Sequence, residues 1–520
     1  MYRKNTTHLQ ENLFDYTTLM PPSMLEELKG SEEYLIYSLI YCKINEDDFQ
    51  CLFSATEGRP NSGINTLVTA IILKHRYGWS IAQLLHNIKF NLATKIALGL
   101  RRIDEVPFSR QTYFNFQTAL GAHASATGIN LLTQVFDALT SDQLKQLKLK
   151  TDIQRTDSFQ ALSNIRTYNR VGLVLEVLIR LHRVLSDEDK NRLEDVFAPF
   201  VKDTAGHFLH HLAESTIDST IIALGAAYRT IHETLVRTHA EVKEFQMFTR
   251  AYHDHFEIVD ACIRVRTNVE MESDTLQSPD DPDATYRKKY GQKFHGQVVN
   301  IVETANPKNP LQLITDVAVA PNNRDDSAVF NERIDEIKAK TPEWKQIHED
   351  AAYPSKENDQ KLETHGVMTI QTAIRGSVAS GVPIEIVQNE DETYTVSCPL
   401  QCVTATPTEK RWKADFDPAV CAGCEHAEKC QLFKYVRGRV YYFTHEEYLK
   451  KLRMTNMEKI DPEHRTLRAN VEATVAEFKQ KTRNGKLRVR GSFKTMVFAV
   501  SMAISINFGR IYRYYEAKPI

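Results

Sequence analysis

Two adjacent β-rich runs in the middle of the chain constrain its fold most. HGQVVNIVET begins at His295 and LQLITDVAVA begins at Leu311, with the loop ANPKNP between them. Both runs are rich in β-branched residues and are bounded by turn signals, so they predict two strands joined by a loop. Helical patterns precede and follow them. The sequence therefore predicts an α/β core, a mixed sheet with flanking helices.

Helical patterns fill the N-terminal part of the chain. Ser23 is expected to cap MLEELKG, Ser80 to cap SIAQLLHNIKFNLATKIALGL, and Ser109 to cap a third helix. LVTAIILKHRYG before Ser80 has a strong apolar face that ends at Gly78. A helix, a short turn with glycine and a second helix form the outline of a helix-turn-helix unit, although plain helical packing gives the same pattern.

Charge is unevenly distributed along the chain. The formal net charge is -2, yet lysines and arginines crowd residues 479–494, and a local patch of this kind can bind phosphates. The N-terminus lacks the apolar segment of a signal peptide, and the longest apolar run, from Met496, is too short to span a bilayer. We therefore expect a cytoplasmic protein.

A charged stripe marks the segment from Arg465 to Gly491. Read as one helix, it places Arg468, Glu472 and Lys479 on one side, next to an apolar stripe that can seat the helix on a core. The members of that apolar stripe are Leu467, Val471, Val475 and Phe478. A solvated surface helix would show the same pattern, so this segment gains meaning only from its context.

Three carboxylates stand out by their local context. Asp157 lies in a short extended segment, DIQRTDSFQAL, and Asp350 follows a predicted strand, while Glu472 lies on the late helix. A strand carboxylate, hairpin strands, a helix, a strand-end carboxylate and a distant helix carboxylate follow the order of an RNase H-like fold. Three hard oxygen ligands on converging elements can hold two Mg²⁺ ions for phosphoryl transfer.

Rival carboxylates receive other assignments. Asp152 ends a lysine-rich helix, and Asp316 is expected in the middle of a strand. Glu349 adjoins Asp350, but strand alternation points their side chains in opposite directions. Asp326 is expected to cap the helix that follows it.

At this point the sequence resembles bacterial insertion-sequence transposases of the DDE type, most closely the insertion sequence 1182 group. QRTDSFQALSNI looks like the first-aspartate segment of that family, and EDAAYPS looks like the second, in which Tyr353 follows Asp350 by three residues. Arg468, Glu472 and Lys479 match three of the four positions of the Tyr-Arg-Glu-Lys signature. The tyrosine position holds Arg465, and Gly296-Gln297 replaces the usual Gly-Tyr.

The resemblance implies a division of the chain into segments. They are a helical DNA-binding domain at 1–125, the first core strand at 145–168, a helical insert at 169–265, core strands with a helix and the second aspartate at 285–360, a β-rich insert with cysteines at 365–450, and C-terminal core helices at 455–520.

The resemblance also implies the chemistry. Asp157, Asp350 and Glu472 would bind two Mg²⁺ or Mn²⁺ ions, and the basic residues would contact DNA. These basic residues are Arg468, Lys479, Arg483, Lys486, Arg488 and Arg490. A homodimer would bind the terminal inverted repeats of double-stranded DNA, cleave the element ends and join them to target DNA. A domesticated DNA-binding protein and an RNase H-like nuclease are the alternatives.

Five of the eight cysteines lie between Cys398 and Cys430. Cys398 and Cys402, followed by Cys421 and Cys424, approach the spacing of a zinc ribbon, with His426 and Cys430 as spare ligands. Reduced thiols in a structural insert are the alternative interpretation.

Overall fold

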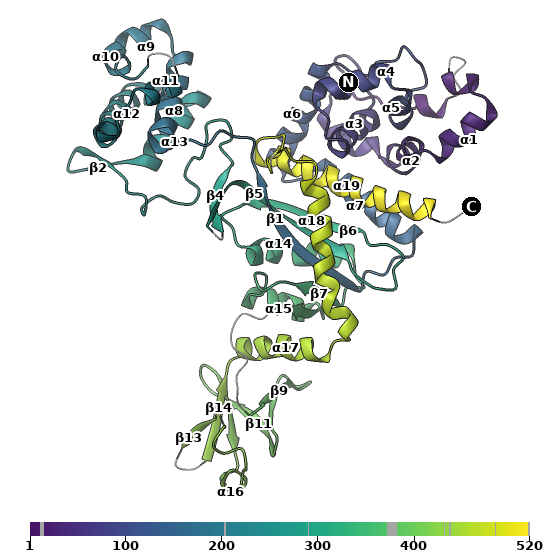
Figure 1. Ribbon diagram of the computed structural model, residues 1–520, viewed down its shortest axis with the longest axis vertical. Helices are drawn as coiled ribbons and strands as arrows, with labels where there is room; N and C mark the ends of the chain where they lie inside the picture. The colour runs from purple at the N-terminus through teal and green to yellow at the C-terminus, as the bar shows by residue number, and fades with distance from the viewer. Residues whose placement is uncertain are drawn as a thin grey trace.

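The computed structural model describes residues 1–10, 15–201, 204–289, 291–371, 382–430, 432–435, 438–483 and 485–517. Its centre is a mixed six-stranded sheet in the order β4-β5-β1-β7-β8, with β6 also paired to β5 (Figure 1). The strands are β1 (Ile153–Leu162), β4 (Thr285–Lys289), β5 (Gln292–Thr304), β6 (Ile314–Pro321), β7 (Gln346–Glu349) and β8 (Met368–Gln371). The two predicted central strands are thus confirmed as β5 and β6.

The sheet has an antiparallel half and a parallel half. β5 pairs antiparallel with β1 and with β6, whereas β7 pairs parallel with β1 and with β8. β5 switches neighbours from β4 to β6 near Gly296, whose φ is +151°. A Cβ there would lie 2.2 Å from the carbonyl oxygen of Ala161, so this crossing requires glycine.

Helices cover both faces of the sheet. α14 (Asp326–Lys340) and α15 (Lys356–Thr364) bury one face around Phe330, Trp344 and Ile347. α18 (Val471–Lys479) and α19 (Ser492–Glu516) cover the other face, where Phe159 contacts Phe478 at 5.3 Å between ring centroids. The predicted apolar stripe is buried: the exposed fractions of Leu467, Val471, Val475 and Phe478 are 8%, 0%, 7% and 0%.

α19 is the central helix of the largest core. By length and composition it could cross a membrane, but 83% of its most apolar window is buried inside the protein. It packs between β6 and two helices of the N-terminal part, α3 and α7 (Figure 1). Burial of this kind is what a core helix of a globular protein shows.

The N-terminal part is helical, as predicted. Its α-helices are α1 (Pro22–Gly30), α2 (Glu32–Leu39), α3 (Ile64–Arg76), α4 (Ile81–Phe90), α5 (Leu92–Ala97), α6 (Arg110–Thr127) and α7 (Leu131–Gln146), and η1 (Thr7–Leu9), η2 (Tyr16–Leu19), η3 (Tyr41–Lys43) and η4 (Glu46–Leu52) are 3-10 turns. Ser80 and Ser109 cap α4 and α6 as predicted. Two expectations were wrong. Ser23 lies inside α1, which begins at Pro22, and Asn91 divides the helix expected after Ser80 into two, because its side chain caps α5.

A helical insert with its own core follows β1. It comprises α8 (Arg170–Val184), α9 (Asp187–Arg192), α10 (Glu194–Phe197), α11 (Ala205–His210), η5 (Glu214–Thr216), α12 (Ile217–His239) and α13 (Lys243–His255). The helices of the insert expected at 169–265 end at His255, because β2 (Phe256–Val259) and β3 (Cys262–Val265) form a hairpin there. The insert lies beside the sheet, on the side away from α1 and α2 (Figure 1).

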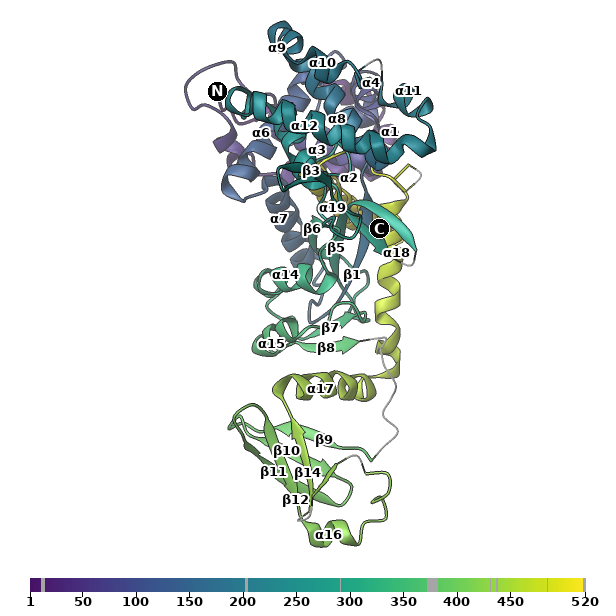
Figure 2. The same cartoon turned by 90° about the vertical axis from the view of Figure 1, so that its left-hand side faces the viewer.

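A second antiparallel sheet lies at the far end of the molecule (Figure 2). Its strands are β9 (Glu385–Gln388), β10 (Tyr394–Cys398), β11 (Gln401–Pro407), β12 (Trp412–Phe416), β13 (Phe433–Tyr435) and β14 (Gly438–Phe443), accompanied by α16 (Pro418–Ala422) and α17 (His445–Lys459). One face packs on α17 through Tyr394, Phe443 and Tyr448. The chain then returns to the central sheet.

The returning segment is not the single helix that the sequence suggested. A 3-10 segment, η6 (Pro462–Asn470), carries Arg468, and α18 begins at Val471 and carries Glu472. The side chain of Arg465, the position where related transposases have tyrosine, lies outside the part that the structure describes.

Candidate active site

The three predicted carboxylates come from three different elements of the central sheet and its cover. Asp157 lies in the middle of β1, Asp350 directly follows β7, and Glu472 lies in the first turn of α18. Because β1 and β7 are parallel neighbours with Arg155 opposite His348, Asp157 and Asp350 project from the same face of the sheet. This face is the one that η6 and α18 cover.

One guanidinium group joins all three carboxylates. Nη2 of Arg468 lies 3.3 Å from Oδ2 of Asp157 and 3.5 Å from Oδ2 of Asp350. Its Nη1 lies 3.6 Å from Oε1 of Glu472, one helical turn further along the chain. The structure thus brings the three carboxylates together around a cation that the protein itself supplies.

The carboxylates differ in their surroundings. Asp157 and Asp350 each use one oxygen to accept a backbone N–H, from Ser158 and Ala352 respectively. Burial raises the pKa of Asp157, and the nearby carboxylates of Asp350 and Glu472 raise it further, while Arg468 opposes them. Glu472 is the most accessible of the three, with 68% of its side chain exposed.

These residues fit a divalent cation by the chemistry of their donors. Three carboxylates supply the hard oxygen ligands that Mg²⁺ and Mn²⁺ prefer, and the position of the guanidinium shows that their geometry attracts a positive charge. Within the described residues, no three His, Cys, Asp or Glu side chains are arranged to hold a metal ion directly. Because the guanidinium of Arg468 lies between the three carboxylates, it would have to move before an ion could bind there.

The rival carboxylates have structural partners. Asp316 lies in β6 and pairs with Arg333 and Lys340, and Glu349 is buried on the opposite face from Asp350, as alternation predicts. Asp152 accepts a hydrogen bond from Asn306 at 2.7 Å. The expectation for Asp326 was wrong.

Asp325 holds the cap position of α14, and Asp326 begins the helix without capping it. Its carboxylate instead accepts a hydrogen bond from the hydroxyl of Ser158 at 2.7 Å.

Tyr353 anchors the loop that carries Asp350. It is 1% exposed, and its hydroxyl accepts a hydrogen bond from the amide of Asn300 at 2.6 Å. The same amide reaches the hydroxyl of Thr156, next to Asp157. The Asp-x2-Tyr spacing thus has a physical meaning here, because the tyrosine fixes the strand-end loop to the two central strands.

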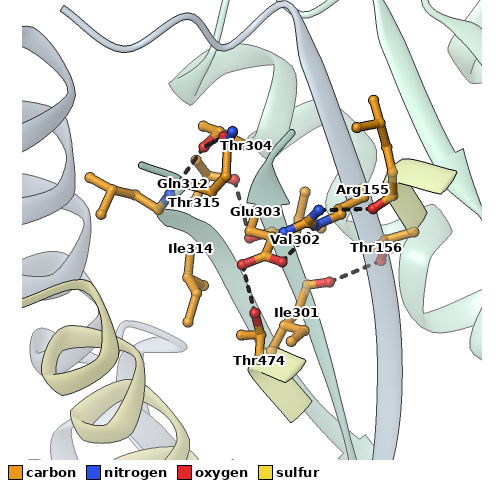
Figure 3. Close-up of polar contacts among 12 residues, drawn as sticks. Arg155, Thr156, Ile301, Val302, Glu303, Thr304, Gln312, Ile314, Thr315 and Thr474 are labelled. Atoms are coloured by element: carbon orange, nitrogen blue, oxygen red, sulfur yellow. Dashed lines mark hydrogen bonds and ion pairs between the residues drawn. The ribbon is translucent and has the colours of Figure 1, made fainter. Parts of the chain in front are cut away.

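A buried ionic network centres on Glu303, two residues from the Asp157 register position in the β1–β5 ladder, and Figure 3 shows Glu303 with Arg155 and Thr474. Glu303 in β5 is fully buried and accepts hydrogen bonds from Arg155 Nε at 2.7 Å, from Thr474 Oγ1 at 2.9 Å and from Arg510 Nη1 at 2.7 Å. Arg155 also donates to the carbonyl oxygen of Leu467 at 2.8 Å.

This network joins three of the elements that carry candidate residues, namely β1, η6 and α18. Arg155 lies two residues before Asp157, Leu467 adjoins Arg468, and Thr474 lies two residues after Glu472. Neither Glu303 nor Arg155 was predicted from the sequence. The available signal was a carboxylate at the end of the apolar run VVNIVET, where burial without a partner would be costly.

Apart from Arg468, the predicted DNA contacts fall into two groups. Lys479 and Arg483 are exposed, in α18 and in the turn after it. The other three bind backbone carbonyl oxygens and thereby fix the basic run in place. Lys486 donates to Ile165 at 2.7 Å, Arg490 donates to Asn164 at 2.6 Å, and Arg488 donates to Gly78 at the end of α3.

The cysteines are not assembled as the zinc-ribbon spacing suggested. Cys398 pairs with Gln401 and Cys402 pairs with Ser397 across the β10–β11 ladder, so the two thiols project from opposite faces. Cys402 is exposed, whereas the Gln401 amide on the other face reaches Sγ of Cys421 at 3.3 Å. A zinc site in this insert stays a prediction.

Two protein-family models match the chain. Residues 26–119 match a family described as Transposase domain (DUF772), and residues 397–512 match one described as Transposase DDE domain. The matches indicate a transposase in general terms. The DDE domain implies an RNase H-like core, with which the mixed sheet is compatible. No curated protein and no solved structure matches the chain.

The second match includes Arg468 and Glu472 but neither aspartate. The assignment of Asp157 and Asp350 therefore rests on the geometry around Arg468.

Proposed function

We propose that this protein is an insertion-sequence transposase of the insertion sequence 1182 group that carries out cut-and-paste transposition. It binds the terminal inverted repeats of its element, cleaves phosphodiester bonds at the element ends and transfers the 3′-hydroxyl ends to target DNA. The observation that carries this proposal is the convergence of Asp157, Asp350 and Glu472 on one cation, inside a chain with two transposase-domain matches.

Asp157, Asp350 and Glu472 would hold two Mg²⁺ or Mn²⁺ ions. When bound, such ions activate the attacking hydroxyl or water and stabilise the leaving oxygen. The protein positions the reacting groups and neutralises charge, because phosphoryl transfer needs little covalent help from side chains. Asp157 is fixed by β1, and Asp350 is fixed by the Tyr353 anchor.

Arg468 would pair with the carboxylates in the free protein and with a DNA phosphate in the complex. Without metal it neutralises the three carboxylates, whose mutual repulsion would otherwise destabilise the site. With metal and DNA bound, its guanidinium is free to pair with a backbone phosphate, for which its fork of donors is well suited. The same side chain therefore serves as an internal counter-ion and as a DNA contact.

Double-stranded DNA is the proposed partner. Lys479, Arg483, Lys486, Arg488 and Arg490 would contact its backbone, and two copies of the chain would hold two element ends. We place the protein in the cytoplasm, associated with the nucleoid. The N-terminal helices would supply end recognition, with the exposed residues of α4 as the candidate reading surface.

A cleavage assay tests the proposal. The substrate is a labelled duplex that carries the inverted repeat flanking the gene, incubated with Mg²⁺ and a target plasmid. We expect nicking at the repeat boundary followed by joining to the plasmid. Cleavage without joining would indicate a nuclease, and repeat binding without cleavage would indicate a domesticated DNA-binding protein.

A further inference from the structure

A small basic pocket lies at the junction between the N-terminal helices and the basic run. Its volume is about 280 Å³. Helices α3, α4 and α6 form one wall, and the segment from Arg488 into α19 forms the other, with Asn164 after β1 between them. The two walls belong to the two different transposase-domain matches.

The pocket is lined by positive charge and by neutral polar groups. No carboxylate is among the lining residues, in the part of the chain that the structure describes. The cationic and amide side chains that line the pocket are those of Lys74, Gln117, Asn164, Arg488, Arg490 and Lys494. Arg490 is partly neutralised from outside by Asp280, at 3.4 Å.

Lys74 is the least expected member of this group. It lies near the end of α3, a helix that is otherwise almost entirely buried, and no ion pair of its ammonium group occurs among the described residues. Burial and the nearby positive charge of Arg488 together lower its pKa to about 8. Arg488 is itself held nearby by its hydrogen bond to the Gly78 carbonyl.

Holding two cations together without an anion is unfavourable in the free protein. A ligand with negative charge would remove this cost, and lysine and arginine are the residues that bind phosphate oxygens. We propose that this pocket binds one backbone phosphate of double-stranded DNA, with Lys74 and Arg488 as its principal contacts. This inference rests on the proposed function and adds Lys74 of the N-terminal helices to the DNA path.

The position of the pocket fits a duplex that runs from the candidate active site. Leu162, five residues after Asp157 along β1, pairs with Lys486 of the basic run. At ~3.3 Å per strand residue, the pocket beside Asn164 lies on the order of 20 Å from Asp157, or about six base-pair steps of DNA. The bound phosphate would therefore lie several base pairs away from the cleaved bond.

The first experiment measures DNA affinity against salt concentration. It uses the full chain in EDTA and a fluorescent 30-base-pair duplex of arbitrary sequence. We expect Lys74→Met to lower the slope of log K against log salt by about 1, as the loss of one phosphate contact requires. Lys74→Arg should keep the slope, because it keeps the charge.

Lys145→Met is the matched control. Lys145 is an exposed lysine in the last turn of α7, and its replacement should leave the slope unchanged. If Lys74→Met, shown to be folded by circular dichroism, has the slope of the wild type, the phosphate site is refuted.

The second experiment separates this inference from the proposed function. Pyrophosphate should raise the melting temperature of the wild type and not that of Lys74→Met. If pyrophosphate raises the melting temperature of the wild type alone but the wild type binds no duplex DNA, the anion-binding pocket is supported and the transposase proposal fails. If the wild type binds duplex DNA, and Lys74→Met and Lys145→Met give the same results as each other in both assays, the phosphate site is refuted and the transposase proposal stands.

Discussion

Replacement of Glu303 by glutamine should destabilise the protein strongly, although it removes only a charge. Glu303 is fully buried, and its carboxylate balances the charges of Arg155 and Arg510. Arg155 is 5% exposed as a whole residue, and the side chain of Arg510 is 13% exposed. Glutamine keeps the volume and one acceptor oxygen, but it leaves buried positive charge without a counter-ion.

Removing one partner of a buried ion pair costs about 3–5 kcal/mol of folding stability. Because glutamine keeps one oxygen that can accept hydrogen bonds from the arginines, we expect Glu303→Gln to cost ~3 kcal/mol, the lower end of this range. For a cooperative unit of the size of the central core, ~3 kcal/mol lowers the melting temperature by roughly 6–12 °C.

Thermal unfolding followed by circular dichroism measures this loss. The matched control is Glu332→Gln, which removes a carboxylate that pairs with Arg324 but whose side chain is 58% exposed. We expect the control to change stability by less than about 1 kcal/mol.

Because the Glu303 network holds β1, η6 and α18 together, Glu303→Gln should also weaken Mn²⁺ binding at temperatures where it is folded. A melting temperature within 2 °C (about 1 kcal/mol) of the wild type would refute the role assigned to this network.

Three further predictions follow from other contacts. Arg468→Gln should bind Mn²⁺ about fivefold more tightly, equivalent to ~1 kcal/mol, since the ion no longer displaces the guanidinium; isothermal titration giving unchanged or weaker binding would contradict this. Lys74→Met should stabilise the protein at pH 7 by on the order of 1–3 kcal/mol, because a lysine with a pKa of about 8 binds its proton less well folded than unfolded. This gain should shrink as the pH rises from about 8 and vanish near 10.5, where the unfolded chain has also lost that proton; a gain that is constant across pH 7–11 in melting experiments would show that Lys74 is not desolvated. If the insert binds zinc, elemental analysis of the purified chain should give one zinc per chain and Cys421→Ser should abolish it, whereas zinc-free protein would end that idea.

Local patterns predicted much of the fold. Strand composition located β5 and β6, because β-branched runs bounded by turns leave few other conformations, whereas the β1 region was expected only as a short extended segment. The serine caps at Ser80 and Ser109 were predictable, since each satisfies backbone donors within one turn. Alternation along β7 correctly separated Glu349 from Asp350.

Features that depend on tertiary contacts were not predictable. The β2–β3 hairpin packs on α12, a contact between segments that the sequence alone does not show. Arg468 lies in a 3-10 segment whose Leu467 carbonyl is held by Arg155, far away in the sequence. The partner of a buried acid such as Glu303 is likewise set by the fold, so the sequence could show the residue but not its role.

The proposed site also combines features that the local sequence predicts with features that only tertiary contacts determine. The order of Asp157, Asp350 and Glu472 suggested a metal-binding trio, and the structure places all three around Arg468. A sequence pattern contains no information on which cation lies between them in the free protein. The counter-ion role of Arg468 therefore emerges only from the geometry.

The most direct test of the central claim is cleavage of end DNA by single carboxylate variants. Asp157→Asn, Asp350→Asn and Glu472→Gln are each compared with the wild type and with Asp316→Asn, using a labelled inverted-repeat duplex and Mg²⁺. We predict that each of the three abolishes nicking while repeat binding in a gel-shift assay persists, and that Asp316→Asn, where folded, retains nicking. Wild-type nicking rates in any of the three variants would contradict the assignment of these carboxylates.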